Sequence, residues 1–204
     1  MKYYYHPGSP NCRKVSAVIE MLGVDATYEF VDLPKGKQAQ PGFLAINPNG
    51  MVPALVDGET TVLESNCIII YLAEKAGSEL WSEEMRLEIL QWMFWEQSHF
   101  MYATGMVFFQ KLLKPLLGQE PDEARVTEAV ATFRRHAQAL DDHLKGREWL
   151  VGDAMTLADL AVAANLTYAE ATDLPMDEFP NVQRWYAAIE ELPAWQTTHP
   201  ALAG

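Results

Sequence analysis

The chain has 204 residues, of which 49% are hydrophobic, so it can form one large domain or two small ones with a sizeable core. Its formal net charge of -13 argues against nucleic-acid and anionic membrane partners, because contacts with phosphates need clustered Lys and Arg. Two cysteines are too few for a disulfide framework, and neither a signal peptide nor a membrane-spanning apolar run is evident. We therefore expect a cytoplasmic protein with reduced thiols.

The first 77 residues alternate between short strand patterns and helix patterns. The strands are predicted at Tyr3–Tyr5, Thr27–Val31, Ala54–Val56 and Thr60–Leu63, and the helices at Pro10–Leu22, Pro41–Ile46 and Ser65–Lys75. The first strand–helix–strand crossover predicts a parallel pair of strands, and Asp57-Gly58 predicts an antiparallel hairpin. Residues 1–77 are therefore expected to form an α/β domain.

Strand patterns end after Gly77, and the rest of the chain is predicted to be helical, with a domain boundary between Gly77 and Ser82. Thr156 and Asp159 have the spacing of a capping box at the start of a helix, with Asp in place of the usual Glu. Two helices are predicted at Glu83–Leu113 and Asp122–Leu144. A third opens at Thr156–Asp159 and contains the small residues of Ala161–Ala169, and the last is predicted at Pro180–Leu192. Residues 83–204 are therefore expected to form an all-helical domain.

The segment Ser9-Pro10-Asn11-Cys12 lies where the first helix is predicted to begin. Ser9 is a good N-cap residue, and Pro10 occupies the first helical position, where proline is tolerated. At a helix N-terminus the unpaired N–H groups and the macrodipole favour a negative charge. These residues are therefore suitably placed to hold a thiolate.

Four segments together resemble the glutathione S-transferase family, most closely its bacterial nu-like group and its serine-type members. They are Ser9–Val15, Asn47–Leu55, Glu64-Ser65 ahead of Tyr71–Lys75, and Thr156–Asp159. The resemblance implies a thioredoxin-like glutathione-binding domain at 1–77 and a helical domain at 83–204 that contributes the electrophile pocket. It implies a homodimeric enzyme that joins reduced glutathione to small apolar electrophiles, or that reduces disulfides with glutathione.

The resemblance offers three candidates for activating the thiol of glutathione. Ser9 occupies the position of the activating hydroxyl in serine-type members, and Asn11 matches the Asn of the nu-like group. Tyr5 aligns with the catalytic Tyr of the tyrosine-type classes, and Cys12 is the third and least favoured candidate. We prefer Ser9 with Asn11. A dithiol oxidoreductase is excluded because no second Cys lies near Cys12.

The same resemblance assigns the contacts with glutathione. It implies a cis bond between Val52 and Pro53, with the Val52 backbone binding the cysteinyl amide. Ser65 would cap a helix and hold the γ-glutamyl carboxylate, while Glu64 lies near the amine of the ligand. Gln38 is expected at the glycyl carboxylate.

Several further residues keep more than one interpretation. Arg134 or Arg135 either reaches glutathione or lies on a solvated helix face. Glu96 and His99 have the spacing of a di-iron ligand pair, but a metal site needs a second such pair, so none is expected.

The aromatic run Met93–Phe109 is interpreted as core and dimer surface, with Tyr102, Met106 and Phe109 as candidates for a pocket wall. The alternative to an enzyme is a non-catalytic module with the same fold.

Overall fold

The described residues of the chain, 1–200 of this computed structural model, divide into two units. The first unit contains Met1–Trp81 together with the described residues from Glu191 onward, and the second contains Ser82–Glu190. The sequence suggests instead that the helical domain extends from residue 83 to the end of the chain. The difference arises at the C-terminal helix, which packs on the first unit.

The first unit is built on a four-stranded sheet with the order β2-β1-β3-β4. The strands are β1 (Lys2–Tyr5), β2 (Thr27–Phe30), β3 (Ala54–Asp57) and β4 (Thr60–Leu63). β1 runs parallel to β2 and antiparallel to β3, which is antiparallel to β4. The predicted parallel crossover and the predicted hairpin at Asp57-Gly58 are thus confirmed. Gly58 has φ +61°, a conformation that glycine adopts without a steric penalty.

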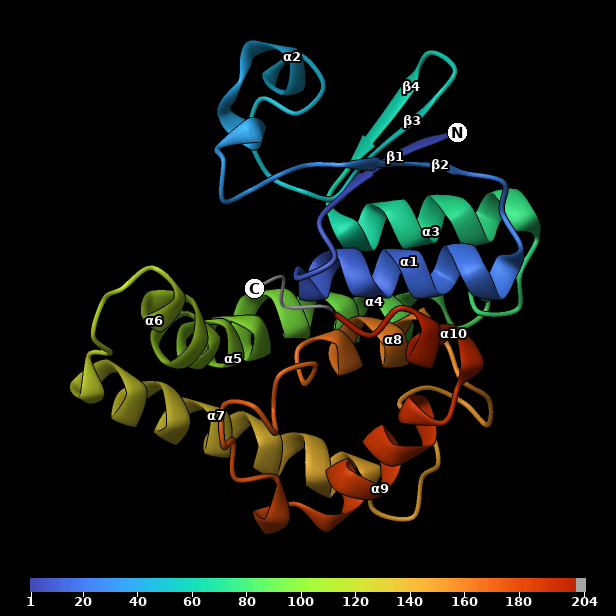
Figure 1. Cartoon of the computed structure of the whole chain (residues 1–204). Helices are drawn as coiled ribbons and strands as arrows, with labels where there is room; N and C mark the ends of the chain where they lie inside the picture. The colour runs from blue at the N-terminus through green and yellow to red at the C-terminus, as the bar shows by residue number, and fades with distance from the viewer. Residues whose placement is uncertain (201–204) are drawn as a thin grey trace. The chain divides into compact units, whose positions relative to one another are not determined.

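Two helices, α1 (Pro10–Leu22) and α3 (Ser65–Ala76), pack together and cover one face of the sheet (Figure 1). Side chains alternate along β1, so Tyr3 faces these helices and Tyr4 faces the other way. The buried Tyr3 hydroxyl donates to the Cys12 carbonyl at 2.8 Å. On the other face, the Tyr4 ring meets Phe43 of the short helix α2 (Pro41–Leu44), with centroids 6.0 Å apart.

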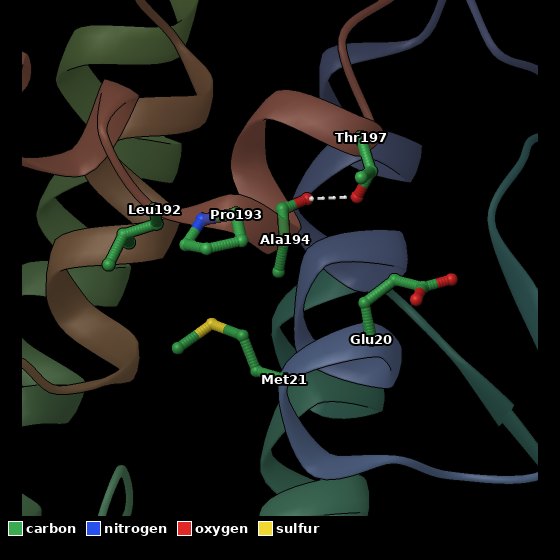
Figure 2. A pocket seen from close by; sticks show the side chains of 6 residues that line it. All are labelled: Glu20, Met21, Leu192, Pro193, Ala194 and Thr197. Carbon is green, nitrogen blue, oxygen red and sulfur yellow. Dashed lines mark hydrogen bonds between the residues drawn. The ribbon is translucent and has the colours of Figure 1, made fainter.

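A short helix that the sequence does not predict, α10 (Pro193–Thr197), packs on α1. The Arg13 guanidinium lies 4.3 Å from the centroid of the Trp195 ring and donates to the Trp195 carbonyl at 3.1 Å. A pocket with a volume of about 400 Å³ lies between α10 and the last turn of α1. Figure 2 shows the side chains that line it. Its lining residues are Glu20, Met21, Leu192, Pro193, Ala194 and Thr197.

The second unit begins with a long helical stretch that the sequence predicts as one helix starting at Glu83. The stretch starts three residues later, and two π-helical turns interrupt it. Its parts are α4 (Arg86–Trp95), the π turn η2 (Glu96–Phe100), α5 (Met101–Phe108), the π turn η3 (Phe109–Leu113) and α6 (Lys114–Leu116). Among the described residues, no helix combines the length and the apolar character needed to cross a bilayer.

Three further helices complete this unit: α7 (Glu123–Leu144), α8 (Leu157–Ala164) and α9 (Pro180–Glu190). The two remaining helical turns among residues 1–200 are η1 (Lys37–Ala39) in the first unit and η4 (Met176–Glu178) in the second. α7 packs against α5 and α9, and α8 packs against α4. α8 ends before the predicted residue Ala169, and Asn165 is its C-cap residue. The Asn165 side chain donates an N–H to buried Glu96 at 2.9 Å.

The predicted capping box at the start of α8 is confirmed. The Thr156 hydroxyl accepts from Ala158 N–H at 3.3 Å, and the Asp159 carboxylate accepts from Thr156 N–H at 2.8 Å. Asp159 also accepts from Leu150 N–H and from the Trp185 indole, both at 2.9 Å. One buried carboxylate therefore ties the preceding loop, α8 and α9 together.

Candidate functional site

Ser9 is the N-cap residue of α1, as predicted. Its backbone is extended, with φ -94° and ψ 121°, and its hydroxyl oxygen accepts from Cys12 N–H at 3.3 Å. Pro10 follows as the first helical residue. A serine hydroxyl has one donor and two acceptor sites, so accepting the cap bond leaves its proton available for another partner. Ser9 can therefore cap the helix and donate to an anion at the same time.

The structure joins two of the predicted site residues directly. The Ser65 hydroxyl donates to Asn11 Oδ1 at 3.2 Å. Asn11 lies in the first turn of α1, and Ser65 is the first residue of α3. This hydrogen bond brings the N-terminal turns of the two helices together. Helix N-termini bind anions through their N–H groups and the positive end of the macrodipole, so the arrangement suits a ligand with more than one negative group.

Ser65 does not cap α3, which corrects the prediction for this residue. Glu64 occupies the N-cap position, with φ +65° and ψ 121°, and its side chain makes no capping bond. β4 ends at Leu63, as predicted, and Glu64 alone makes the turn into the helix. A non-glycine residue at positive φ costs on the order of 1–3 kcal/mol and persists where its surroundings fix it.

The Val52–Pro53 peptide bond is cis, as the resemblance implies, and Pro53 is buried directly before β3. The loop that leads to this bond lies against the turn containing Gln38. A Cβ built on Gly50 would lie 3.2 Å from the Gln38 carbonyl oxygen, so the two segments touch here. Gly50 has φ +62°, which also favours glycine.

The Gln38 side chain has a buried oxygen, Oε1, without a hydrogen-bond partner in the described part of the chain. A buried amide oxygen without a partner costs about 1–3 kcal/mol. A bound ligand that completes the hydrogen bonds of this amide would remove that cost. Because this oxygen only accepts, its missing partner would be a donor, whereas a carboxylate would have to bond the N–H groups of the same amide.

The rival activating residues have surroundings of a different kind. The Tyr5 ring packs with Tyr3 and Tyr28, at centroid distances of 5.5 and 5.2 Å, and its hydroxyl makes no hydrogen bond with the described residues. Cys12 is 1% exposed, and burial raises the pKa of its thiol to about 11. A thiol with that pKa is almost fully protonated at neutral pH, which weakens the case for Cys12 as a nucleophile. Cys67, in contrast to its apolar sequence pattern, is exposed.

Other sequence candidates have partners within the helical unit. Arg134 forms a two-pronged ion pair with Glu178, at 2.7 Å from Nη2 to Oε1 and 2.9 Å from Nε to Oε2. Arg135 Nη2 lies 3.1 Å from His136 Nε2, and the His99 ring stacks on His136 with centroids 5.3 Å apart. Within residues 1–200, no group of three or more His, Cys, Asp or Glu side chains could hold a metal ion.

Lys14 is a further residue of this region, which the sequence motifs alone do not assign to the site. This lysine is buried on α1, and its ammonium donates to Asn66 Oδ1 of α3 at 2.7 Å. A signal was present, because positions 14, 18 and 21 follow helical spacing and the other two are Val18 and Met21. A lysine within an apolar helical stripe points to a buried charge.

The α1–α10 pocket lies away from this site. Its α1 residues, Glu20 and Met21, are in the last turn of the helix. At a rise of 1.5 Å per residue, they lie about 15 Å along the axis from Asn11. The pocket therefore has no part in the arrangement around Asn11 and Ser65.

Comparison with known proteins decides the family. A family model described as "Glutathione S-transferase, N-terminal domain" matches residues 4–80, and one described as "Glutathione S-transferase, C-terminal domain" matches residues 99–193. The chain belongs to the glutathione S-transferase family. As a member it is a transferase, and its co-substrate is glutathione. The predicted family, enzyme class and fold, a thioredoxin-like α/β domain with an all-helical domain, are confirmed.

Relatives of this glutathione S-transferase extend over nearly its whole length. Glutathione S-transferase 3 of Zea mays is 36% identical over 211 residues, covering 99% of this chain and 94% of the relative. A family member from Pseudomonas fluorescens, solved with two glutathione bound, is 30% identical with a TM-score of 0.87, covering 98% of this chain and 92% of its own. A glutathione transferase from Pseudomonas putida, solved with one glutathione disulfide per subunit, is 28% identical with a TM-score of 0.88. That match covers 99% of this chain and 91% of the Pseudomonas putida chain.

Proposed function

We propose that the protein transfers the thiolate of reduced glutathione to small apolar electrophiles, and that Ser9 and Asn11 stabilise the sulfur. The hydrogen bond between Ser65 and Asn11 is the observation that carries this proposal. It holds two helix N-termini together, and glutathione has two groups that suit them: the γ-glutamyl carboxylate for α3 and the ionised sulfur for α1.

The energy needed for ionisation is within reach of these groups. A free thiol of this kind has a pKa of about 8.5, and lowering it by two units requires about 2.7 kcal/mol of differential stabilisation. A hydroxyl hydrogen bond to a charged atom contributes about 1.5–3 kcal/mol. A helix N-terminus adds about 0.3–1 kcal/mol. The remaining part of the rate acceleration would come from positioning the thiolate against the electrophile.

The remaining contacts follow the family resemblance. Val52, before cis Pro53, offers its backbone to the cysteinyl amide of glutathione. Ser65 and the α3 N-terminus hold the γ-glutamyl carboxylate, with Glu64 near the amine. Gln38 would contact the glycyl carboxylate through its amide N–H groups, because its oxygen, like the carboxylate, only accepts hydrogen bonds. This assigns glutathione binding to residues 1–77.

The residues from 83 onward supply the wall for the electrophile. Tyr102 and Phe109 are candidates because both are large, apolar and exposed. We also expect a homodimer, which would cover exposed apolar side chains such as Met51 and Phe94. Free Cys12 and Cys67 fit a cytoplasmic location.

Reduction of disulfides is a second candidate function, favoured by the glutathione disulfide in the similar Pseudomonas putida structure. The glutathione thiolate would attack one sulfur of the substrate, form a mixed disulfide and release the other sulfur as a thiolate. A second glutathione would then attack the mixed disulfide, giving glutathione disulfide and the reduced substrate. The same stabilised thiolate serves both reactions.

The test combines retention on glutathione resin with assays on chlorodinitrobenzene and hydroxyethyl disulfide. We expect the wild type to bind and to act on at least one substrate, Ser9→Ala to lose most activity, and Tyr5→Phe to keep it. Loss of activity in Tyr5→Phe with an active Ser9→Ala would transfer the activating role to Tyr5. Retention without either activity would support the non-catalytic module.

A further inference from the structure

Lys14 is a buried lysine next to the proposed glutathione site. It lies three residues after Asn11 on α1, and its relative exposure is 0%. Its ammonium donates to Oδ1 of Asn66, the second residue of α3, at 2.7 Å. Lysine is almost never fully buried unless it is paired, so this contact is a specific feature of the site. Because an ammonium can only donate, it also fixes which end of the Asn66 amide faces α1.

Two hydrogen bonds now connect the first turns of α1 and α3. Asn11 and Lys14, three residues apart on α1, contact the consecutive residues Ser65 and Asn66 on α3. One of these bonds involves a residue assigned to the γ-glutamyl carboxylate, and the other involves its neighbour in the chain. The position of the α3 N-terminus relative to α1 therefore depends on Lys14 as well as on Asn11.

The ammonium also contributes charge. Each helix N-terminus carries about half an elementary positive charge, and Lys14 adds a full one beside them. A buried charge is screened by salt much less than an exposed one, so its effect reaches the neighbouring site.

We propose that Lys14 is a positioning residue of the glutathione site, which fixes the first turn of α3 through Asn66 and supplies buried positive charge that favours the bound carboxylate and thiolate. The inference rests on the proposed function of this site. It predicts effects on both the affinity for glutathione and the ionisation of its sulfur.

The decisive variant is Lys14→Met, which retains the length of the side chain and removes the ammonium. The change also takes this donor away from Asn66 Oδ1, so circular dichroism must first show that the variant is folded. Calorimetry should show the Kd for glutathione raised by about tenfold, which corresponds to about 1.4 kcal/mol. The ultraviolet absorbance of the bound thiolate should titrate about 0.5–1 unit higher in pH.

Two control variants separate position from charge. Asn66→Ala breaks the contact but retains the ammonium, so it should weaken binding with a smaller shift of the thiolate titration. Lys14→Arg retains the charge, so the thiol of its bound glutathione should ionise at nearly the same pH as in the wild type. If circular dichroism shows that Lys14→Met is unfolded, the same measurements on Lys14→Gln decide whether the inference holds.

The outcomes for the two proposals are distinct. A wild type that binds no glutathione would overturn the proposed function and this inference with it. A wild type that binds and ionises glutathione, together with a Lys14→Met variant that has the same Kd and the same titration midpoint, would overturn the role of Lys14 alone.

Discussion

The removal of the Asp159 carboxylate should be the most damaging single change in the helical unit. The side chain has 0% exposure and accepts four hydrogen bonds, from Leu150 N–H, Thr156 N–H, the Thr156 hydroxyl and the Trp185 indole. Burial raises the pKa of Asp159, and these hydrogen bonds oppose that shift. Four donors pointing at two oxygens leave no acceptor for a carboxyl proton, so we infer that the group is ionised at neutral pH.

The size of the effect follows from the donors that lose their partner. Asp159→Ala leaves three buried N–H groups unpaired, at about 1–3 kcal/mol each, so the loss should be at least about 3 kcal/mol. Domains are stable by about 5–15 kcal/mol, so this is a large fraction of the total. Asp159→Asn retains the shape but turns an NH₂ group toward two of the donors, whichever way the amide lies. It should therefore be about as damaging as Ala.

Urea unfolding followed by tryptophan fluorescence measures these losses. The matched control is Asp122→Ala, because Asp122 also accepts two N–H bonds at a helix start but is exposed. Water can replace the Asp122 carboxylate at this exposed position, so the free energy of unfolding of the control should fall by about 1 kcal/mol. An Asp159→Asn variant within about 1 kcal/mol of the wild type would refute the reasoning, since it would show that the paired carboxylate matters little.

Three further outcomes are expected. In Ser9→Ala the loss of kcat/KM for glutathione should be largest below about pH 8.5 and should fade above it, because the thiol of glutathione then ionises unaided. A loss of the same size at every pH of a pH–rate profile would contradict the role of the hydroxyl. Alkylation of the native protein at neutral pH, followed by peptide mass spectrometry, should label exposed Cys67 and spare buried Cys12 until the chain is unfolded. Burial, together with nearby positive charge, lowers the pKa of His136 in the folded state, so the unfolded chain binds more protons and stability should fall as pH drops below about 6.5. His136→Gln should flatten that part of the stability–pH curve, and an unchanged curve would exclude His136 as its source.

Features set by neighbouring residues were predictable from the sequence. The N-cap at Ser9, the hairpin at Asp57-Gly58 and the capping box of Thr156 and Asp159 each depend on residues a few positions apart. Side-chain chemistry and local backbone preferences decide such motifs, so the pattern is sufficient.

Features that depend on distant contacts were not predictable in this way. Whether Ser65 caps α3 depends on the backbone of Glu64, whose positive φ no local pattern predicts. The helical spacing of Lys14 with Val18 and Met21 indicates burial, but its partner Asn66 on α3 is evident only in the fold. Among the candidate site residues, the roles came from the family resemblance, whereas the contact between Asn11 and Ser65 needed the coordinates.

The contact between Arg13 and Trp195 has a consequence for how the protein is made. The two partners are 182 residues apart in the chain, yet both belong to the first unit. At translation rates of 5–20 residues per second, Arg13 is added to the chain roughly 10 to 40 seconds before Trp195. Throughout that interval the side of α1 that α10 will cover is open to chaperones. The part of the molecule synthesised first is thus among the last to be completed.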